Sequence, residues 1–234
     1  MKKHCLLFVF FLLTVPTHAQ DFGLSFSYFI PKNGYFSAPV SPFSMRGLGV
    51  DLSRWFAIET GATLYRVTGL GLKDLPFEYK GPIAGANFTL FVPAELVLMI
   101  HAGSMEIDLK GGCFFFYAFD QHLNYGHLDR AIRTYEGWSV ANAAAKFKTY
   151  PGWGYHAGTE LTFPVVRQFG ASLEVNYLLG QAKFPISGSY TGGNTAIETR
   201  TFNFADARMD FSGLEISIGV FYQTGRTAMR RKRR

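Results

Sequence analysis

The chain has 234 residues, of which 48% are hydrophobic, 17% aromatic and 17% charged, with 25 glycines; this composition excludes disorder and favours strands over helix bundles. Cys5 lies in an N-terminal segment that we expect to be removed and Cys113 is the other cysteine, so a disulfide scaffold is excluded. The net charge of +6 resides at the two ends, because residues 21–225 carry 15 basic and 17 acidic side chains, and a nucleic-acid partner is therefore not expected.

The N-terminus has the pattern of a secretory signal peptide. Lys2 and Lys3 precede an apolar run over residues 5–15, and Thr17 and Ala19 form a small-x-small ending. This predicts a signal peptide over residues 1–19, with cleavage before Gln20. The alternative, a membrane-spanning helix, would need roughly 20 apolar residues, and this run is shorter.

The rest of the chain shows large apolar residues alternating with small or polar ones. In the first such segment Phe22, Leu24 and Phe26 alternate with Gly23 and Ser25, which is the period of a strand with two different faces. The eight alternating segments cover residues 22–30, 47–53, 58–64, 88–98, 105–117, 155–163, 171–179 and 213–222. They predict an all-β fold, an eight-stranded antiparallel up-and-down barrel.

The predicted connections alternate between short and long. Short turns are expected near residues 54–55, 100–103 and 167–168, and long loops over residues 31–44, 69–85, 120–151 and 185–206. A further hairpin, made of residues 135–140 and 145–150, is an alternative that would extend strands above the membrane or, with less support, raise the strand count to ten. Because short and long connections alternate, one end of the barrel is expected to carry only short turns, and we call it the trimmed end. The other end is expected to carry the long loops.

The bulky face of the alternating segments is expected to point outward. Eight strands leave an interior just wide enough for side chains, so a face with large apolar residues on every strand does not fit inside, and a general diffusion pore is disfavoured. An outward apolar band of this extent needs lipid. Aromatic residues near the predicted strand ends suggest two interfacial girdles: Trp55, Phe56, Phe163, Phe169 and Tyr222 at the turn side, and Tyr28, Phe88, Tyr117, Trp153 and Tyr155 at the loop side. The alternative is a soluble barrel whose apolar face lines a ligand cavity.

From Phe22 to Tyr222 the chain resembles the small eight-stranded outer-membrane barrels of Gram-negative bacteria, of the OmpX and OmpA-transmembrane-domain type, and the related barrel family widespread in Bacteroidota. The final strand, residues 214–222, resembles the aromatic-ending insertion signal of such proteins. The resemblance implies an outer-membrane location, short periplasmic turns and long extracellular loops. It divides the chain into a signal peptide (1–19), a barrel (20–222) and a basic C-terminal tail (223–234), which departs from the family pattern.

The predicted inner face carries a set of charged residues near the trimmed end. These are Glu59, Glu95, Glu106, Asp108, Lys110, Glu160, Glu174 and Glu215. A buried cluster of carboxylates needs cationic partners, for which Lys110, Arg46, Arg54 and Arg66 are candidates. We interpret the set as a polar plug of ion pairs; a cation site or a proton-sensitive gate is the alternative, and an acid–base pair of Glu106 and Asp108 is disfavoured.

The remaining candidates lie in the long loops and in the wall. Residues 120–129 contain His122, His127 and two aspartates, but their spacing matches no metal motif, so a solvated loop with neither metal nor cofactor is expected. Tyr135, Trp138 and Tyr150 are candidates for recognition at the loop surface. Cys113 is expected to face lipid as a small apolar side chain.

These features predict a non-enzymatic outer-membrane protein with no catalytic residues, acting as a structural element or recognising an extracellular or periplasmic protein partner. Outer-membrane lipid is the other expected partner. The alternatives are an accessory barrel of an envelope secretion or transport machinery and, with less support, a lipid-modifying barrel enzyme.

Overall fold

The computed structural model describes residues 21–35, 44–166 and 169–223. The predicted signal peptide (1–19) lies outside the described residues, as does the basic segment beyond Gln223. No helix in the described ranges is long and apolar enough to cross a membrane.

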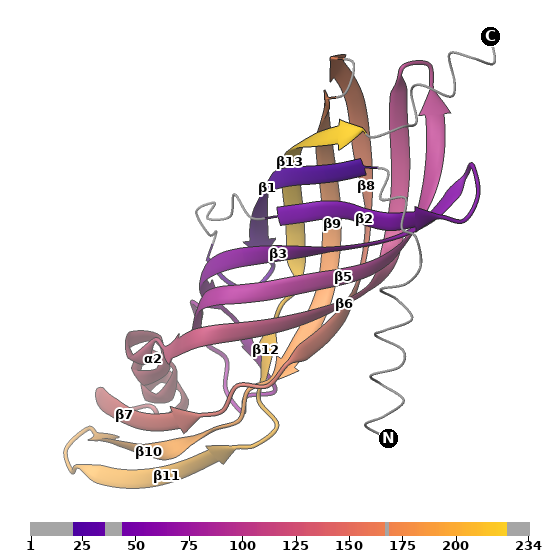
Figure 1. Ribbon diagram of the computed structural model, residues 1–234. Coiled ribbons are helices and arrows are strands. Elements are labelled where there is room, and N and C mark those ends of the chain that lie inside the picture. The colour runs from indigo at the N-terminus through magenta and orange to yellow at the C-terminus, as the bar shows by residue number, and fades with distance from the viewer. Residues whose placement is uncertain (1–20, 36–43, 167–168, 224–234) are drawn as a thin grey trace, which may run out of the picture.

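Most of the described chain forms one antiparallel sheet whose strands follow one another around a ring (Figure 1). In ring order these strands are β1 (Asp21–Pro31), β2 (Ser44–Asp51), β3 (Phe56–Leu70), β5 (Ala84–Ala102), β6 (Met105–Leu123), β8 (Gly152–Val166), β9 (Phe169–Lys183) and β13 (Gly213–Gln223). Strand β13 pairs with both β9 and β1 and so closes the ring. The all-β antiparallel prediction is confirmed; seven of the eight alternating segments lie within these strands, and the segment 47–53 runs two residues past the end of β2.

The ring is uneven in the extent of its pairings. Strands β1 and β13 pair along their whole length, from Asp21 opposite Gln223 to Pro31 opposite Gly213. Among the described residues, strands β1 and β2 pair only where residues 23–25 meet residues 44–46. The connections of β2 to β3 (52–55) and of β5 to β6 (103–104), the end of β8 at Val166 and the start of β9 at Phe169 lie at one end of the ring, which we call the turn end.

The opposite end carries a second folded layer, which we call the cap (Figure 1). It consists of helix α2 (Tyr125–Glu136) and a three-stranded sheet in the order β11 (Glu198–Phe204), β10 (Ile186–Gly193), β7 (Val140–Phe147). Short strands β4 (Leu72–Lys73) and β12 (Arg208–Asp210) pair with each other and continue the main sheet from β9.

The helix begins and ends at residues suited to capping. The Asn124 side chain accepts a hydrogen bond from the backbone N–H of His127, and Gly137 adopts the left-handed conformation with φ 68°. The predicted alternative hairpin is therefore wrong. Tyr135 lies in the last turn of α2, and β7 pairs with β10 instead of with residues 145–150.

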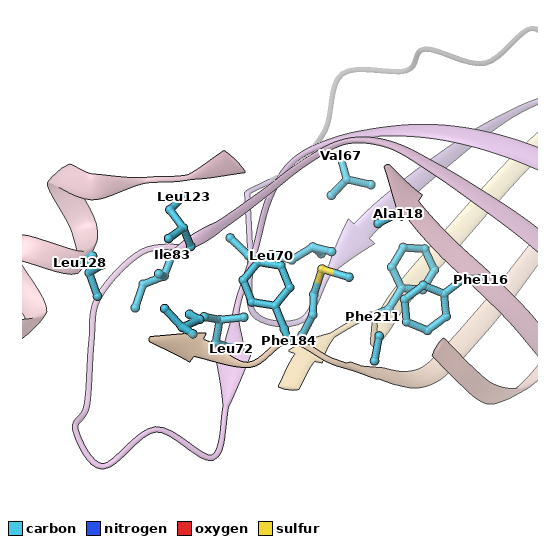
Figure 2. Packing of buried hydrophobic residues seen from close by; sticks show 14 of the residues in the cluster. Val67, Leu70, Leu72, Ile83, Phe116, Ala118, Leu123, Leu128, Phe184 and Phe211 are labelled. Carbon is cyan, nitrogen blue, oxygen red and sulfur yellow. The ribbon is translucent and has the colours of Figure 1, made fainter. Parts of the chain in front are cut away.

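Aromatic side chains fill the interior of the ring on its cap side. Phe211 stacks on Phe29 and on Phe116, with ring centroids 4.5 Å apart in both pairs, and Phe91 and Phe114 complete this interior cluster. The prediction of an inner face with only small, polar and charged residues is wrong for this half of the barrel. Figure 2 shows the apolar core continuing from Phe116 and Phe211 past Leu70, Leu72 and Ile83 to Leu128 of α2.

Facing glycines make room for these rings. Phe114 pairs with Gly154, which pairs in turn with Gly180, so one large and two small residues share a row across three strands. Phe116 likewise pairs with Gly152 and, beyond it, Ala182. The interior is wide enough for phenylalanines because the neighbouring positions have little or no side chain.

We expect Gly154→Ala to lower the free energy of unfolding by about 1–3 kcal/mol, because the added methyl group would overlap the Phe114 ring and the Leu179 carbonyl oxygen. Gly111→Ala is the matched control, since its methyl group would meet only the His156 carbonyl oxygen, at 3.8 Å. Urea unfolding of both variants in lipid vesicles measures the difference. Equal stability of the two variants would contradict this account of the packing.

Candidate functional site

Charged side chains occupy the interior of the ring toward the turn end, on inward positions of seven strands. We call this set the charge network: Arg46 and Lys110 with the carboxylates Glu59, Glu95, Glu106, Asp108, Glu160, Glu174 and Glu215. Strand register brings the acids together, because Asp108 pairs with Glu160 and Glu160 pairs with Glu174. Like charges directly opposite one another destabilise a sheet unless a cation lies between them.

Lys110 supplies that cation. Its ammonium nitrogen lies 2.6 Å from a carboxylate oxygen of Glu160, 3.4 Å from one of Glu59 and 3.8 Å from one of Glu174. The Lys110 side chain is only 1% exposed. Lys110 of β6 therefore forms ion pairs with residues of β3, β8 and β9, in a space from which water is nearly excluded.

Arg46 holds the other side of the network. Its guanidinium contacts Glu215 and lies 3.6 Å from Glu174, while the Tyr65 hydroxyl donates to the same Glu215. The Asn176 amide joins the two carboxylates by donating to Glu174 and to Glu215, at 2.8 Å each. Residues far apart in the sequence thus form one connected polar core.

Two acids of the network retain atoms without a hydrogen-bond partner. Both carboxylate oxygens of Glu95 are buried without a hydrogen-bond partner. The nearest basic group is the His156 ring, whose Nε2 lies 3.8 Å from a Glu95 oxygen. One carboxylate oxygen of Asp108 is likewise buried and without a hydrogen-bond partner. Among the described residues, neither of these two acids forms an ion pair with Arg46 or Lys110.

Two of the four candidate cations are not partners of the network. Arg54 lies in the turn after β2, with its guanidinium carbon 5.0 Å from the centre of the exposed Trp55 ring. Arg66 is exposed on β3. The expectation that they neutralise the cluster is wrong, because one stands at the rim and the other on the outward face.

A small cavity of about 60 Å³ opens between the network and the turn end. Its lining includes Arg46 and the carboxylates Glu59, Glu106, Asp108, Glu160 and Glu174, together with Gly219, Val220 and Phe221 of β13. Glu106 also pairs with His101 across the β5–β6 turn, at 2.9 Å. The cavity has room for a few water molecules or for one small charged group.

The histidines predicted for the loop do not come together. Both ring nitrogens of His127 have partners, the Pro82 carbonyl at 2.8 Å and the Tyr35 hydroxyl at 3.1 Å. Asp129 accepts a hydrogen bond from the backbone of Ala143, and His122 is exposed elsewhere on β6. Within the described ranges, no three His, Cys, Asp or Glu side chains are placed to hold a metal ion. Cys113 is exposed on the outer face of β6.

The loop aromatics have different environments. Tyr135 and Tyr150 are 54% and 41% exposed, whereas Trp138 packs on Tyr190 and beneath the Arg200 guanidinium. Trp138 therefore packs within the cap and is only partly exposed at its surface.

A polar cluster in the cap was not predicted from the sequence. Glu136 accepts a hydrogen bond from the Tyr190 hydroxyl and pairs with Arg200. Burial and the hydrogen bond to Glu136 raise the pKa of Tyr190. These three residues lie on α2, β10 and β11, so only the folded chain brings them together.

No family model matches the chain, and no curated protein matches it either. Among solved structures, the outer membrane protein OprG from Pseudomonas aeruginosa is similar, with 16% identity over 88% of this chain and 96% of that chain and a TM-score of 0.48. A major outer membrane protein from Thermus thermophilus is similar at 9% identity over 88% of this chain and 100% of that chain, with a TM-score of 0.44.

Proposed function

We propose that the chain is an outer-membrane β-barrel of the small eight-stranded type, with the turn end in the periplasm and the cap outside the cell. In this proposal it has no enzymatic role and acts as a structural or recognition element. The observation that carries the proposal is the inversion of the two faces: large apolar side chains point outward around the ring, while charges are buried inside it.

The outward apolar surface is continuous across strands. One row of paired residues runs from Phe26 of β1 through β13, β9, β8 and β6 to Ile100 of β5; its members are Phe26, Ile218, Leu173, Leu161, Ile107 and Ile100. Ile218 is 58% exposed and Phe26 57%. A soluble protein would expose such a band to water, whereas in a bilayer it meets acyl chains.

Aromatic side chains mark both ends of this band. Trp55, Phe56 and Phe169 are exposed near the turn end. Tyr117, Trp153 and Tyr155 are exposed toward the cap. Rings at two levels on the outer surface suit the two lipid–water interfaces of a barrel.

The cap supports the recognition role. It is a folded layer in which Leu128 and Ile132 of α2 are buried in the apolar core that continues from the barrel interior. Tyr135 presents an exposed ring on this layer, and Tyr150 is exposed in the link from β7 to β8. Aromatic side chains held on a rigid support are suited to contacts with a protein partner.

The experiment that tests the location is the electrophoretic mobility of the protein in the isolated outer-membrane fraction, with and without boiling. We expect a band whose mobility changes on heating, because a closed barrel resists detergent until it is unfolded. A protein recovered only in the soluble periplasm would contradict the proposal and return the soluble ligand-binding barrel to consideration.

We expect Ile218→Arg to lower the free energy of unfolding in lipid vesicles by roughly 2–4 kcal/mol, because residue 218 lies midway along β13 and would place a charge among acyl chains. Val140→Arg is the matched control, since Val140 is 57% exposed but lies in the cap. We expect the control to change stability by less than about 0.5 kcal/mol. If Ile218→Arg proved as harmless as the control in urea titrations, the outer face would not contact lipid.

A further inference from the structure

A groove of about 520 Å³ lies in the outer wall of the barrel on its cap side, across β6, β8 and β9. Its lining includes the side chains of Trp153, Tyr155 and Leu179. Tyr155 pairs with Leu179, and Trp153 pairs with Gln181, so these side chains form two neighbouring rows on the outward face. The groove is therefore continuous with the apolar band that the proposed function places against lipid.

The outward face of β9 changes from apolar to basic at the level of the groove. Leu179 is an exposed apolar side chain, whereas Gln181 and Lys183, the next outward residues, are polar and charged. Trp153 lies opposite Gln181, and tryptophan is typical of the lipid–water interface of a barrel. Under the proposed orientation, the groove opens at the interface on the outer side of the membrane.

Three cationic residues lie in one row just beyond the groove, which we call the basic row: Lys73 of β4, Arg208 of β12 and Lys183 of β9. Arg208 pairs with Lys73 on one side and with Lys183 on the other, at the cap end of the ring (Figure 1). Side chains of directly paired residues project to the same face, so three like charges stand side by side. Such an arrangement destabilises a sheet unless anions lie between the charges.

The neighbouring acids leave this row incompletely paired. The Lys73 ammonium lies 2.9 Å from a carboxylate oxygen of Asp210, and Arg208 Nε lies 3.3 Å from one of Asp74. Lys183 is exposed, and within the described part of the chain no carboxylate pairs with it. The side chains of Lys73 and Arg208 remain 45% and 43% exposed, so all three cations are accessible to a further anion.

The groove and the basic row are parts of one surface. Lys73 belongs to both, and Lys183 is two residues from Gln181 of the groove lining, or about 7 Å along the strand. A ligand with an anionic head and an apolar chain therefore fits both, with its head on the row and its chain beside Trp153. A phosphate monoester suits the head, because it carries roughly −1.5 to −2 charge near neutral pH and acceptor oxygens for Arg and Lys donors.

We propose that the groove and the basic row bind one phosphorylated lipid of the outer leaflet, with its phosphate on Lys183, Arg208 and Lys73 and an acyl chain in the groove. The inference rests on the proposed outer-membrane location and adds to it a defined lipid site on the barrel wall. The phosphate offsets the repulsion between the three cations. It also holds the lipid at the point where its chain enters the groove.

Native mass spectrometry of the full-length chain in a neutral detergent, titrated with diphosphorylated lipid A, tests the proposal. We expect one lipid to remain bound per chain. The same lipid with its phosphates removed should bind roughly tenfold more weakly or worse, because it lacks the charge-assisted hydrogen bonds to the basic row. Equal binding of the two lipids would overturn the proposal. Displacement of lipid A by inorganic phosphate at the same concentration would also overturn it, since the acyl chain would then contribute nothing.

The head-group variant is Lys183→Gln with Arg208→Gln. Its matched control is Lys146→Gln with Arg133→Gln, two exposed cations of the cap. We expect the head-group variant to lose the preference for the phosphorylated lipid and to bind the dephosphorylated lipid as before, while the control keeps the preference. A preference that survives in the head-group variant would contradict the role of the basic row.

Trp153→Ala tests the acyl chain separately. This change removes a ring from the groove and leaves the basic row intact, so we expect it to weaken binding of both lipids by a similar factor. Unchanged binding of both lipids would show that the chain does not lie in the groove, and the proposed site would be wrong.

The gel band that depends on boiling separates failure of this inference from failure of the proposed function. Because Lys183 and Arg208 lie outside the barrel interior, we expect the head-group variant to keep the band. An unaltered chain that shows the band in the outer-membrane fraction but binds both lipids equally would overturn the lipid site alone. An unaltered chain without the band would overturn the proposed location, and the lipid site with it.

Discussion

Lys110→Met is expected to lower the free energy of unfolding by about 3–5 kcal/mol, which is the usual cost of removing one partner from a buried ion pair. Methionine has a similar length and fills the space. The loss of stability therefore comes mainly from the missing positive charge and not from a change in side-chain volume. Lys110 lies between Glu59, Glu160 and Glu174, and among the described residues its removal leaves Glu59 and Glu160 without a cationic partner inside the ring. The measurement is urea unfolding in lipid vesicles, followed by the loss of the unboiled gel band.

Lys146→Met is the control, because it makes the same substitution at an exposed position of β7. We expect a change below about 0.5 kcal/mol there. The double variant Lys110→Met with Glu160→Gln should be more stable than the sum of the two single effects implies, by about 1–3 kcal/mol. Strict additivity would mean that Lys110 and Glu160 do not interact, in contradiction to their 2.6 Å separation.

Phe211→Ala is expected to lower the free energy of unfolding by about 3–5 kcal/mol, because it creates a cavity. Phe211 is fully buried and stacks between Phe29 and Phe116, so its removal leaves a cavity in the centre of the barrel. The ring walls are hydrogen-bonded strands that cannot move inward to fill the space. The same urea titration measures the loss.

Phe211→Leu supplies the graded comparison, because it removes fewer atoms and leaves a smaller cavity. We expect its cost to be less than half of that of Phe211→Ala. Equal costs for the two variants would show that the interior collapses around either residue, and that the aromatic cluster does not pack as the structure describes.

The strands of this protein could be predicted closely, because their signal is local. Alternation such as that of Leu214, Ile216 and Ile218 reflects the two faces that any strand presents, whatever its neighbours are. The outward position of the bulky face followed from comparing side-chain volume with the interior of a small barrel. Inward acids such as Glu59 and Glu174 were identified by the same alternation.

The interior and the cap were predicted less well, because they depend on pairings between distant residues. Phe114 fits inside the ring because Gly154 and Gly180 lie beside it, and that neighbourhood exists only once three strands are in register. Arg66 is a suitable cation by residue type, but its side chain is exposed while the neighbouring Tyr65 and Val67 are buried. Only a residue on the inward face of its strand can take part in the charge network.

The sequence by itself determined the alternating strands, their outward apolar face and the acids near one end, since all of these arise within a few residues of chain. The tertiary structure alone decided that β7 pairs with β10, that Glu136, Tyr190 and Arg200 meet in the cap, and that Lys110 and Arg46 divide the carboxylates between them. The physical reason is the range of the interactions: backbone geometry sets the period of a strand locally, whereas partners in a closed ring are chosen by packing and charge between residues that only folding brings together.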